Sequence, residues 1–364
     1  MGLLSRLFSK IEAPVVTYDD FWKWFQSNAA AFHKVVKQRG DLEKEFFDKL
    51  GPKLNALKDG YWYLTGMYDD HCAELVLTAD GALENIVFVE ELVAAAPAIP
   101  HWRITALKPA LSIEDVNINM DGYEFKESNL SFYATHHEDY PDEVDIVFVY
   151  DGFNETDRDT IVNGVFIFLD NYLGELYAAT AIDKVTVRGR EQQEQELIPM
   201  GKLKDYLIWR EKEFVEKYSD VWHDNGDGQY ALMEGTLKSG NPIIGVIDQD
   251  LLEWDGKASH PWMVVLELKY GGKASQGMPD RNTSDLLNAI EDELTPVLPA
   301  AAGYLHIGRT TANNVRTIYW ACKEFRQVSK VLFATVKKYE GRIDISYDIF
   351  KDKYWQSVEQ YRQR

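Results

Sequence analysis

Three ionisable residues near the C-terminal end of the chain have types and spacings suited to molecular recognition. His306 and Arg309 lie on one predicted strand, and Arg316 lies across a predicted hairpin from them. An arginine guanidinium can hold a carboxylate or phosphate through two parallel hydrogen bonds. The same residues are also typical of a cross-strand charge cluster with a half-buried histidine, and we favour that interpretation. If the protein has a recognition patch, we expect it here.

The segment from His223 to Glu234 shares part of the pattern of a calcium-binding loop. Asn225, Asp227 and Glu234 stand at ligand positions of such a loop, with Gly228 at its sharp turn. The first ligand position holds His223 instead of an aspartate, and the following residues predict a strand where the motif needs a helix. We therefore interpret the segment as an ordinary Asn/Gly/Asp turn.

Two further groups of polar residues have no spacing that specifies a site. His136 and His137 begin an acidic loop, but neighbouring residues of an extended chain point to opposite faces. Asp248, Asp250 and Glu253 follow a predicted strand without a nucleophile or phosphate-binding loop nearby. We interpret the first group as a solvated loop and the second as surface charge.

No known cofactor or catalytic motif occurs in the chain. It has no Walker A motif, dinucleotide-binding glycine fingerprint, HExxH or GxSxG sequence. Its two cysteines, Cys72 and Cys322, are far apart and outside any metal-ligand spacing, which indicates free thiols in a reducing compartment. We expect no cofactor and no metal, and a cytoplasmic location.

Composition and charge narrow the classes of partner. The chain has 364 residues, 45% of them hydrophobic, so it can bury the cores of two domains. Its formal net charge of -20 disfavours non-specific binding to nucleic acid or to anionic lipid. No segment approaches the roughly 18 apolar residues of a membrane span. The first ten residues predict a frayed or docked terminus, with a membrane-touching turn as the alternative.

Hydrophobic periodicity predicts an N-terminal helical hairpin. Phe21, Phe25 and Phe32 recur at helical spacing after a capping box that begins at Thr17, and a second helix should be interrupted or kinked at Gly51-Pro52. Trp22 and Trp24 flank this stripe, and we assign these aromatic side chains to core packing in preference to ligand stacking.

Two successive segments then predict the same order of strand, strand, helix and strand. The first runs from Tyr61 to Leu107, and the second from Tyr123, as one long strand to Thr135, onward to Arg188. We infer two similar ββαβ half-units whose sheets join into one domain.

The overall prediction is an α+β protein. It comprises an N-terminal domain over residues 1–190, a linking helix over 191–220 and a C-terminal domain over 221–364. From Trp262 onward the predicted order is strand, helix, strand, strand, helix and strand, with Asn282 or Ser284 capping the first helix. This order is that of the ferredoxin-like α/β sandwich.

The C-terminal half resembles a bacterial family catalogued as domain of unknown function 695. The resemblance covers roughly residues 220 to 360 and rests on an aromatic-rich start after Tyr218 and on four further segments: Trp262–Leu268, the acidic helix around Ile290–Leu294, Gly303–Thr311 and Arg316–Ala321. The latter part is also similar to the small acidic family called regulator of RNase E activity B, or RNase E inhibitor. That similarity implies action by binding a protein, without catalysis.

These observations lead to one principal functional hypothesis and two alternatives. We expect a non-catalytic binding or regulatory protein with a protein partner. A hydrolase with a noncontiguous carboxylate and histidine site is the competing hypothesis, and a homodimeric scaffold is the third.

Overall fold

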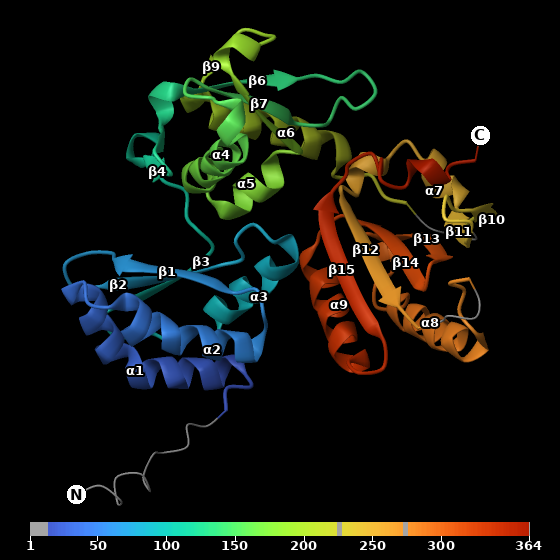
Figure 1. Ribbon diagram of the computed structural model, residues 1–364, viewed down its shortest axis with the longest axis horizontal. Helices are drawn as coiled ribbons and strands as arrows, with labels where there is room; N and C mark the ends of the chain where they lie inside the picture. Colours follow the sequence, from blue (N-terminus) through green and yellow to red (C-terminus); the bar gives the residue numbers. More distant parts are fainter. Residues whose placement is uncertain (1–13, 224–227, 272–275, 364) are drawn as a thin grey trace, which may run out of the picture. The chain divides into compact units, whose positions relative to one another are not determined.

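The computed structural model describes residues 14–223, 228–271 and 276–363, and the chain divides into two compact units between Pro109 and Ala110 (Figure 1). The first ten residues, for which we predicted a frayed or docked terminus, lie outside the described ranges. Among the described residues, no helix combines the length and apolar character needed to cross a membrane.

The first unit packs three helices with a three-stranded sheet. Its elements are α1 (Tyr18–Gln38), α2 (Asp48–Leu57), β1 (Trp62–Met67), β2 (Ala73–Thr78), α3 (Leu83–Ala94) and β3 (Trp102–Ala106). The capping box is confirmed: Thr17 Oγ1 accepts a hydrogen bond from Asp20 N at 3.1 Å, and the Asp20 carboxylate accepts one from Thr17 N at 3.0 Å.

The aromatic residues of α1 form the core of this unit. Phe21, Trp22 and Phe25 are almost completely buried, and the Trp22 indole donates a hydrogen bond to Leu92 O at 2.7 Å. The assignment to core packing is therefore confirmed for Trp22, while Trp24 is half-buried against Phe25 and Phe32 at the edge of the core.

We predicted an interruption or a kink at Gly51-Pro52, and the interruption is wrong. A π-helical turn over Glu43–Phe47 leads into α2, and the helix continues through Pro52 to Leu57. Leu50 and Leu54, on either side of the proline, are completely buried. The packing of these two side chains stabilises the helix against the local cost of the proline.

The second unit begins with a four-stranded sheet covered by helices. Its elements are β4 (Ile118–Met120), β5 (Tyr123–Phe125), β6 (Leu130–Thr135), β7 (Asp145–Tyr150), α4 (Arg158–Leu173), α5 (Glu175–Ala181), β8 (Lys184–Gly189), β9 (Ile198–Pro199) and α6 (Leu203–Tyr218). The strand order is β8-β7-β6-β9, while β4 and β5 pair separately.

The predicted order of strand, strand, helix and strand occurs twice. In both copies the first two strands form an antiparallel hairpin, and the strand after the helix pairs parallel to the second. The expectation that the two sheets join is wrong, because they are separate sheets in different compact units. The expected long strand from Tyr123 to Thr135 is also broken, because Asn129 accepts a hydrogen bond from Lys126 N and donates one to Glu124 O.

The last part of the second unit is a six-stranded antiparallel sheet with helices. Its elements are β10 (Tyr230–Thr236), β11 (Pro242–Asp248), α7 (Gln249–Glu253), β12 (Trp262–Lys269), α8 (Arg281–Leu294), β13 (Tyr304–Ala312), β14 (Val315–Cys322), α9 (Arg326–Tyr339) and β15 (Asp344–Lys351). The strand order is β10-β11-β13-β14-β12-β15. Its last four strands have the ferredoxin-like order, so that prediction is confirmed. Asp280 caps α8, in place of Asn282 or Ser284.

The two faces of this sheet are covered by different segments. The helix face lies under α8 and α9: Arg309 of β13 pairs with Glu291 of α8, and Tyr347 of β15 donates a hydrogen bond to Ser329 O of α9. The opposite face carries an apolar cluster that includes Met263 and Leu305 and is closed by Trp355 from the C-terminal segment. The sheet is thus buried on both sides, which is why its strands are rich in apolar residues.

A β-bulge in β13 decides which side chains face the helices. The register between β13 and β14 shifts between His306 and Gly308. Residues three apart on a regular strand point to opposite faces, but one extra residue restores His306 to the face of Arg309. Gly308 has a φ of 141°, and a Cβ atom placed there would lie 2.2 Å from Val246 O of β11. Only glycine suits this position.

We predict that Gly308→Ala lowers the free energy of unfolding by about 3 kcal/mol, because strain at the left-handed backbone adds to the clash with β11. The matched control is Gly245→Ala, since a Cβ there would have its nearest neighbour at an ordinary 3.6 Å. Urea unfolding followed by circular dichroism measures both variants. Equal stability of the two variants would contradict the assigned role of the bulge.

A buried histidine supplies a second prediction. His260 is completely buried beside Trp254 and Trp355, and its Nδ1 atom lies 2.8 Å from Ser259 Oγ. Burial, aided by the charges of Lys323 and His223, lowers the pKa of His260 to about 3. The unfolded chain therefore binds one more proton than the folded chain between about pH 6.5 and pH 3.

Stability should consequently fall as the pH is lowered through this range. The contribution of His260 to the loss is about 2 kcal/mol between pH 7 and pH 5. Urea unfolding at both pH values should show a smaller loss for His260→Gln than for the wild type, whereas His136→Gln, at an exposed position, should leave the difference unchanged. An identical pH dependence in all three proteins would refute the assignment to His260.

Candidate functional site: a buried glutamate under two arginines

The centre of the candidate site is a carboxylate on the buried side of α8. Leu287, Ile290 and Leu294 form the core face of this helix, and Glu291 lies one turn after Leu287 on the same side. Glu291 is only 5% exposed. A carboxylate in such a position requires opposite charge or hydrogen-bond donors, because burial strongly disfavours an isolated ion.

All three residues of the predicted patch gather around this carboxylate. Arg309 Nη1 lies 2.6 Å from Glu291 Oε1, Arg316 Nη1 lies 3.6 Å from Oε2, and His306 Nε2 lies 3.5 Å from Oε1. Arg316 also donates a hydrogen bond to Asn288 Oδ1 at 2.7 Å. The sheet therefore contributes two permanent cations to one helix carboxylate.

His306 is not a free surface group. Burial lowers the pKa of its imidazole, the charge of Arg309 lowers it further, and Glu291 opposes both effects. The imidazole is therefore neutral at pH 7. Its Nε2 atom and the Trp320 Nε1 atom beside it are both buried without a hydrogen-bond partner among the described residues. The site thus retains polar atoms that the protein itself does not satisfy.

A hollow opens next to the two arginines. Its volume is about 300 Å³, and its polar lining comes from Arg309, Arg316, Thr311 and Ser284. The Arg309 side chain is 31% exposed, whereas that of Arg316 is 8% exposed. Arg309 consequently has donors directed to solvent, while Arg316 contributes charge from beneath.

The carboxylates after β11 do not converge. Asp248 Oδ1 accepts hydrogen bonds from the backbone of Asp250 and Leu251 and so caps α7, while Glu253 forms an ion pair with Arg362 near the C-terminus. These side chains serve structural roles at separate places.

The segment that shares the calcium-loop pattern is only partly described. Asn225 and Asp227 lie outside the described residues. The part that follows is strand β10, which carries Glu234, so the prediction of a strand in place of the motif's exiting helix is confirmed.

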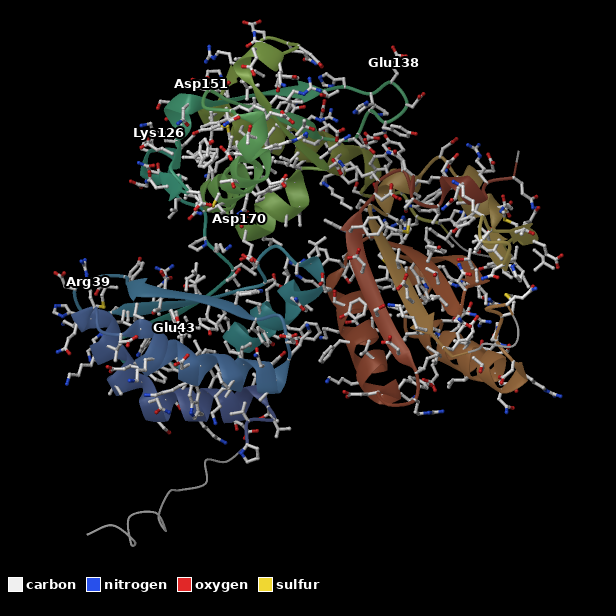
Figure 2. All side chains as sticks on the ribbon, in the orientation of Figure 1. Arg39, Glu43, Lys126, Glu138, Asp151 and Asp170 are labelled. Carbon is white, nitrogen blue, oxygen red and sulfur yellow. The ribbon has the colours of Figure 1, made fainter. Side chains whose placement is uncertain are left out.

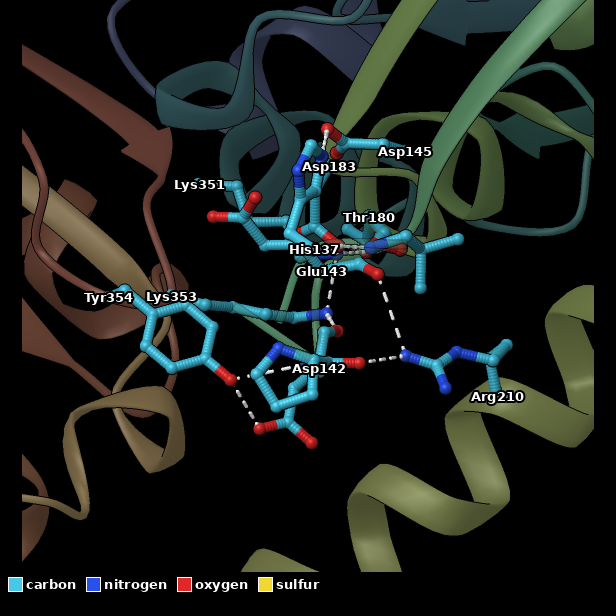
Figure 3. A network of polar contacts seen from close by, with 12 residues as sticks. His137, Asp142, Glu143, Asp145, Thr180, Asp183, Arg210, Lys351, Lys353 and Tyr354 are labelled. Atoms are coloured by element: carbon cyan, nitrogen blue, oxygen red, sulfur yellow. Dashed lines mark hydrogen bonds and ion pairs between the residues drawn. The ribbon is translucent and has the colours of Figure 1, made fainter. Parts of the chain in front are cut away.

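The sequence analysis missed a second polar network (Figure 3). It joins residues just before β7 and β8 to the end of β15 and the residues that follow it. Asp183 accepts from Lys353 Nζ at 2.8 Å and pairs with Lys351 Nζ at 3.1 Å. Burial lowers the pKa of Lys351 to about 8, although Asp183 opposes this. Asp142 accepts hydrogen bonds from Tyr354 and Tyr218. These partners lie up to 212 residues apart, so local spacing contains no sign of the network.

The loop from His136 to Asp139 is placed near this network. Figure 2 shows Glu138 directed outward at the end of the loop between β6 and β7. His136, Glu138 and Asp139 are exposed, as the prediction of a solvated loop requires, but His137 turns inward to Asp145.

A comparison with known protein families gives one match, in the C-terminal part of the chain. Residues 238–361 match the model of a family described as "Family of unknown function (DUF695)". The C-terminal part therefore carries a DUF695 domain, which confirms the family resemblance of that half. Searches of curated proteins and of solved structures found no match. The family match includes every charged residue that surrounds Glu291.

We predict that Glu291→Gln lowers the free energy of unfolding by about 3 kcal/mol, because the buried charge of Arg316 loses its counterion. Glu293→Gln is the matched control: it lies on the same helix, and its ion pair with Lys338 joins two largely exposed side chains. In chemical denaturation, the loss in the free energy of unfolding should be several-fold larger for Glu291→Gln than for Glu293→Gln. A loss at Glu293 as large as that at Glu291 would refute the central role of the buried carboxylate.

Proposed function

We propose that this protein acts without catalysis, as a binding or regulatory protein, and that the hollow beside Arg309 and Arg316 receives an acidic group of a protein partner. The supporting observation is the ratio of two guanidinium groups to one carboxylate at this place. Glu291 neutralises one positive charge, and the second is left to attract an anion. His306 adds no charge because its imidazole is neutral at pH 7.

The form of the hollow favours a carboxylate carried by a protein. A volume of about 300 Å³ lies at the lower end of the range of ligand pockets and suits one acidic side chain or a chain terminus. Arg309 can offer a bidentate contact, and the hydroxyls of Thr311 and Ser284 offer further polar contacts. The net charge of -20 makes nucleic acid a poor partner.

The proposal agrees with the mode of action that the RNase E inhibitor resemblance implies. In that mode a protein acts by binding another protein, without catalysis. The proposed contact has a specific chemistry: an acidic group of the partner against Arg309.

The hydrolase alternative has one supporting observation, the approach of His306 to Glu291 at 3.5 Å. A hydrolase that forms a covalent intermediate also needs a protein nucleophile next to the base. The Thr311 hydroxyl accepts a hydrogen bond from Arg316 Nε at 3.4 Å, and no hydrogen bond joins His306 to a hydroxyl in the described parts of the chain. The geometry therefore favours binding.

The test compares Arg309→Gln with Arg281→Gln, which removes the same charge from an exposed position at the start of α8. Affinity capture from a lysate of the source organism, quantified by mass spectrometry, should identify a partner that the wild type and Arg281→Gln recover equally. Arg309→Gln should recover at least tenfold less, as expected for a lost charge-assisted contact.

Binding of the purified partner should then be measured by calorimetry, and a peptide carrying its acidic segment should compete. If Arg309→Gln and Arg281→Gln behave alike toward every captured protein, the proposed contact is wrong. Turnover of a captured protein or peptide that is lost in His306→Gln would support the hydrolase alternative in its place.

A further inference from the structure

One imidazole and two carboxylates come together at the loop end of the β6–β7 hairpin. Thr135, the last residue of β6, pairs with Asp145, the first residue of β7. His137 follows this pair by two residues and Glu143 precedes it by two residues, so both lie in the loop that joins the strands. The side chains of His137, Glu143 and Asp145 converge there, whereas the neighbouring His136 is exposed and does not belong to the group.

The distances between ligand atoms show how closely the three side chains approach one another. His137 Nε2 lies 2.9 Å from Asp145 Oδ2, and one ligand atom from each of the three residues lies within 4.8 Å of the other two. Metal–ligand bonds of about 2.0–2.2 Å place neighbouring ligand atoms roughly 3 Å apart. Small rotations of the Glu143 side chain therefore suffice to close the group around one cation.

An unsatisfied buried atom belongs to the same group. The Asp145 side chain is 10% exposed, and its Oδ1 atom is buried with no hydrogen-bond donor in the described part of the chain. Such an atom calls for a water molecule or an ion. The neighbouring lysines do not supply the missing charge, because Lys351 and Lys353 pair with Asp183 (Figure 3).

We propose that His137, Glu143 and Asp145 bind one divalent transition-metal cation of the Zn²⁺ type. A mixed set of one imidazole nitrogen and two carboxylate oxygens suits Zn²⁺ better than Ca²⁺ or Mg²⁺, which prefer oxygen alone. The His137 side chain is 37% exposed, so water can occupy the remaining coordination positions. Gln356 Nε2 donates a hydrogen bond to Glu143 Oε1 at 2.7 Å and orients this ligand from the C-terminal segment.

The bound cation would fasten the loop between β6 and β7. Asp142 within this loop already accepts a hydrogen bond from Tyr354 at 2.6 Å, and Lys353 donates one to its carbonyl at 2.5 Å. A metal ion bound by His137, Glu143 and Asp145 would add a further link between this loop and β7. The site is separate from the hollow at Arg309, so either proposal can fail without the other.

The experiment uses the full chain, stripped with a chelator and then titrated with ZnCl₂ in a calorimeter. We expect one equivalent of Zn²⁺ to bind and His137→Ala to weaken the affinity at least tenfold. His136→Ala is the matched control because it removes the adjacent imidazole, which is exposed and outside the group of three. Co²⁺ added to the stripped wild type should give visible absorption bands that are lost in His137→Ala and retained in His136→Ala.

Two outcomes would overturn the proposal. One is the absence of Zn²⁺ binding to the wild type at millimolar concentrations, and the other is an equal loss of affinity in His136→Ala and His137→Ala, which would indicate adventitious histidine binding. If His137→Ala fails to fold, Glu143→Gln replaces it, because Glu143 is a half-exposed loop residue. The expected loss for Glu143→Gln is also at least tenfold, and unchanged affinity in that variant would count against the site.

Discussion

An ionised side chain is stable away from water only when opposite charge and hydrogen bonds surround it, and this requirement determines the arrangement between α8 and the sheet. Glu291 is held there by Arg309 and Arg316, which project from neighbouring strands of the ferredoxin-like part. The pairing fixes the rotation of α8 over the sheet as well as the place of the charges. A helix held only by Leu287, Ile290 and Leu294 could slide with a smaller penalty, because apolar contacts are not directional.

The bulge in β13 is the backbone counterpart of this pairing. Without the extra residue, His306 would face the apolar cluster that includes Met263 and Leu305 on the opposite side of the sheet. The close approach of β11 to Gly308 then requires a residue without a side chain. One glycine therefore supports both the sheet and the set of polar groups around Glu291.

The sequence predicted the strand order after Trp262 because period-two and period-3.6 patterns alternate cleanly there. It also placed His306, Arg309 and Arg316 in one patch, since a short hairpin joins their strands. Glu291 was missed because it lies on another element, although its position four residues after Leu287 on the core face was a usable signal. Sequence patterns failed where tertiary packing outweighs local preference, as at Pro52, where buried leucines carry the helix through.

The two polar groups of this unit differ in how their residues are brought together, and this difference explains which of them sequence patterns can find. At the loop end of the β6–β7 hairpin, His137, Glu143 and Asp145 are close in sequence and lie at or just beyond the paired strand ends, so they can be found once the pairing is known. The neighbouring His136 is exposed and lies outside this group. Around Glu291 the set depends on a bulge and on a helix crossing, neither of which has a fixed spacing in sequence. Around Glu291 opposite charges meet because burial allows few other arrangements for them.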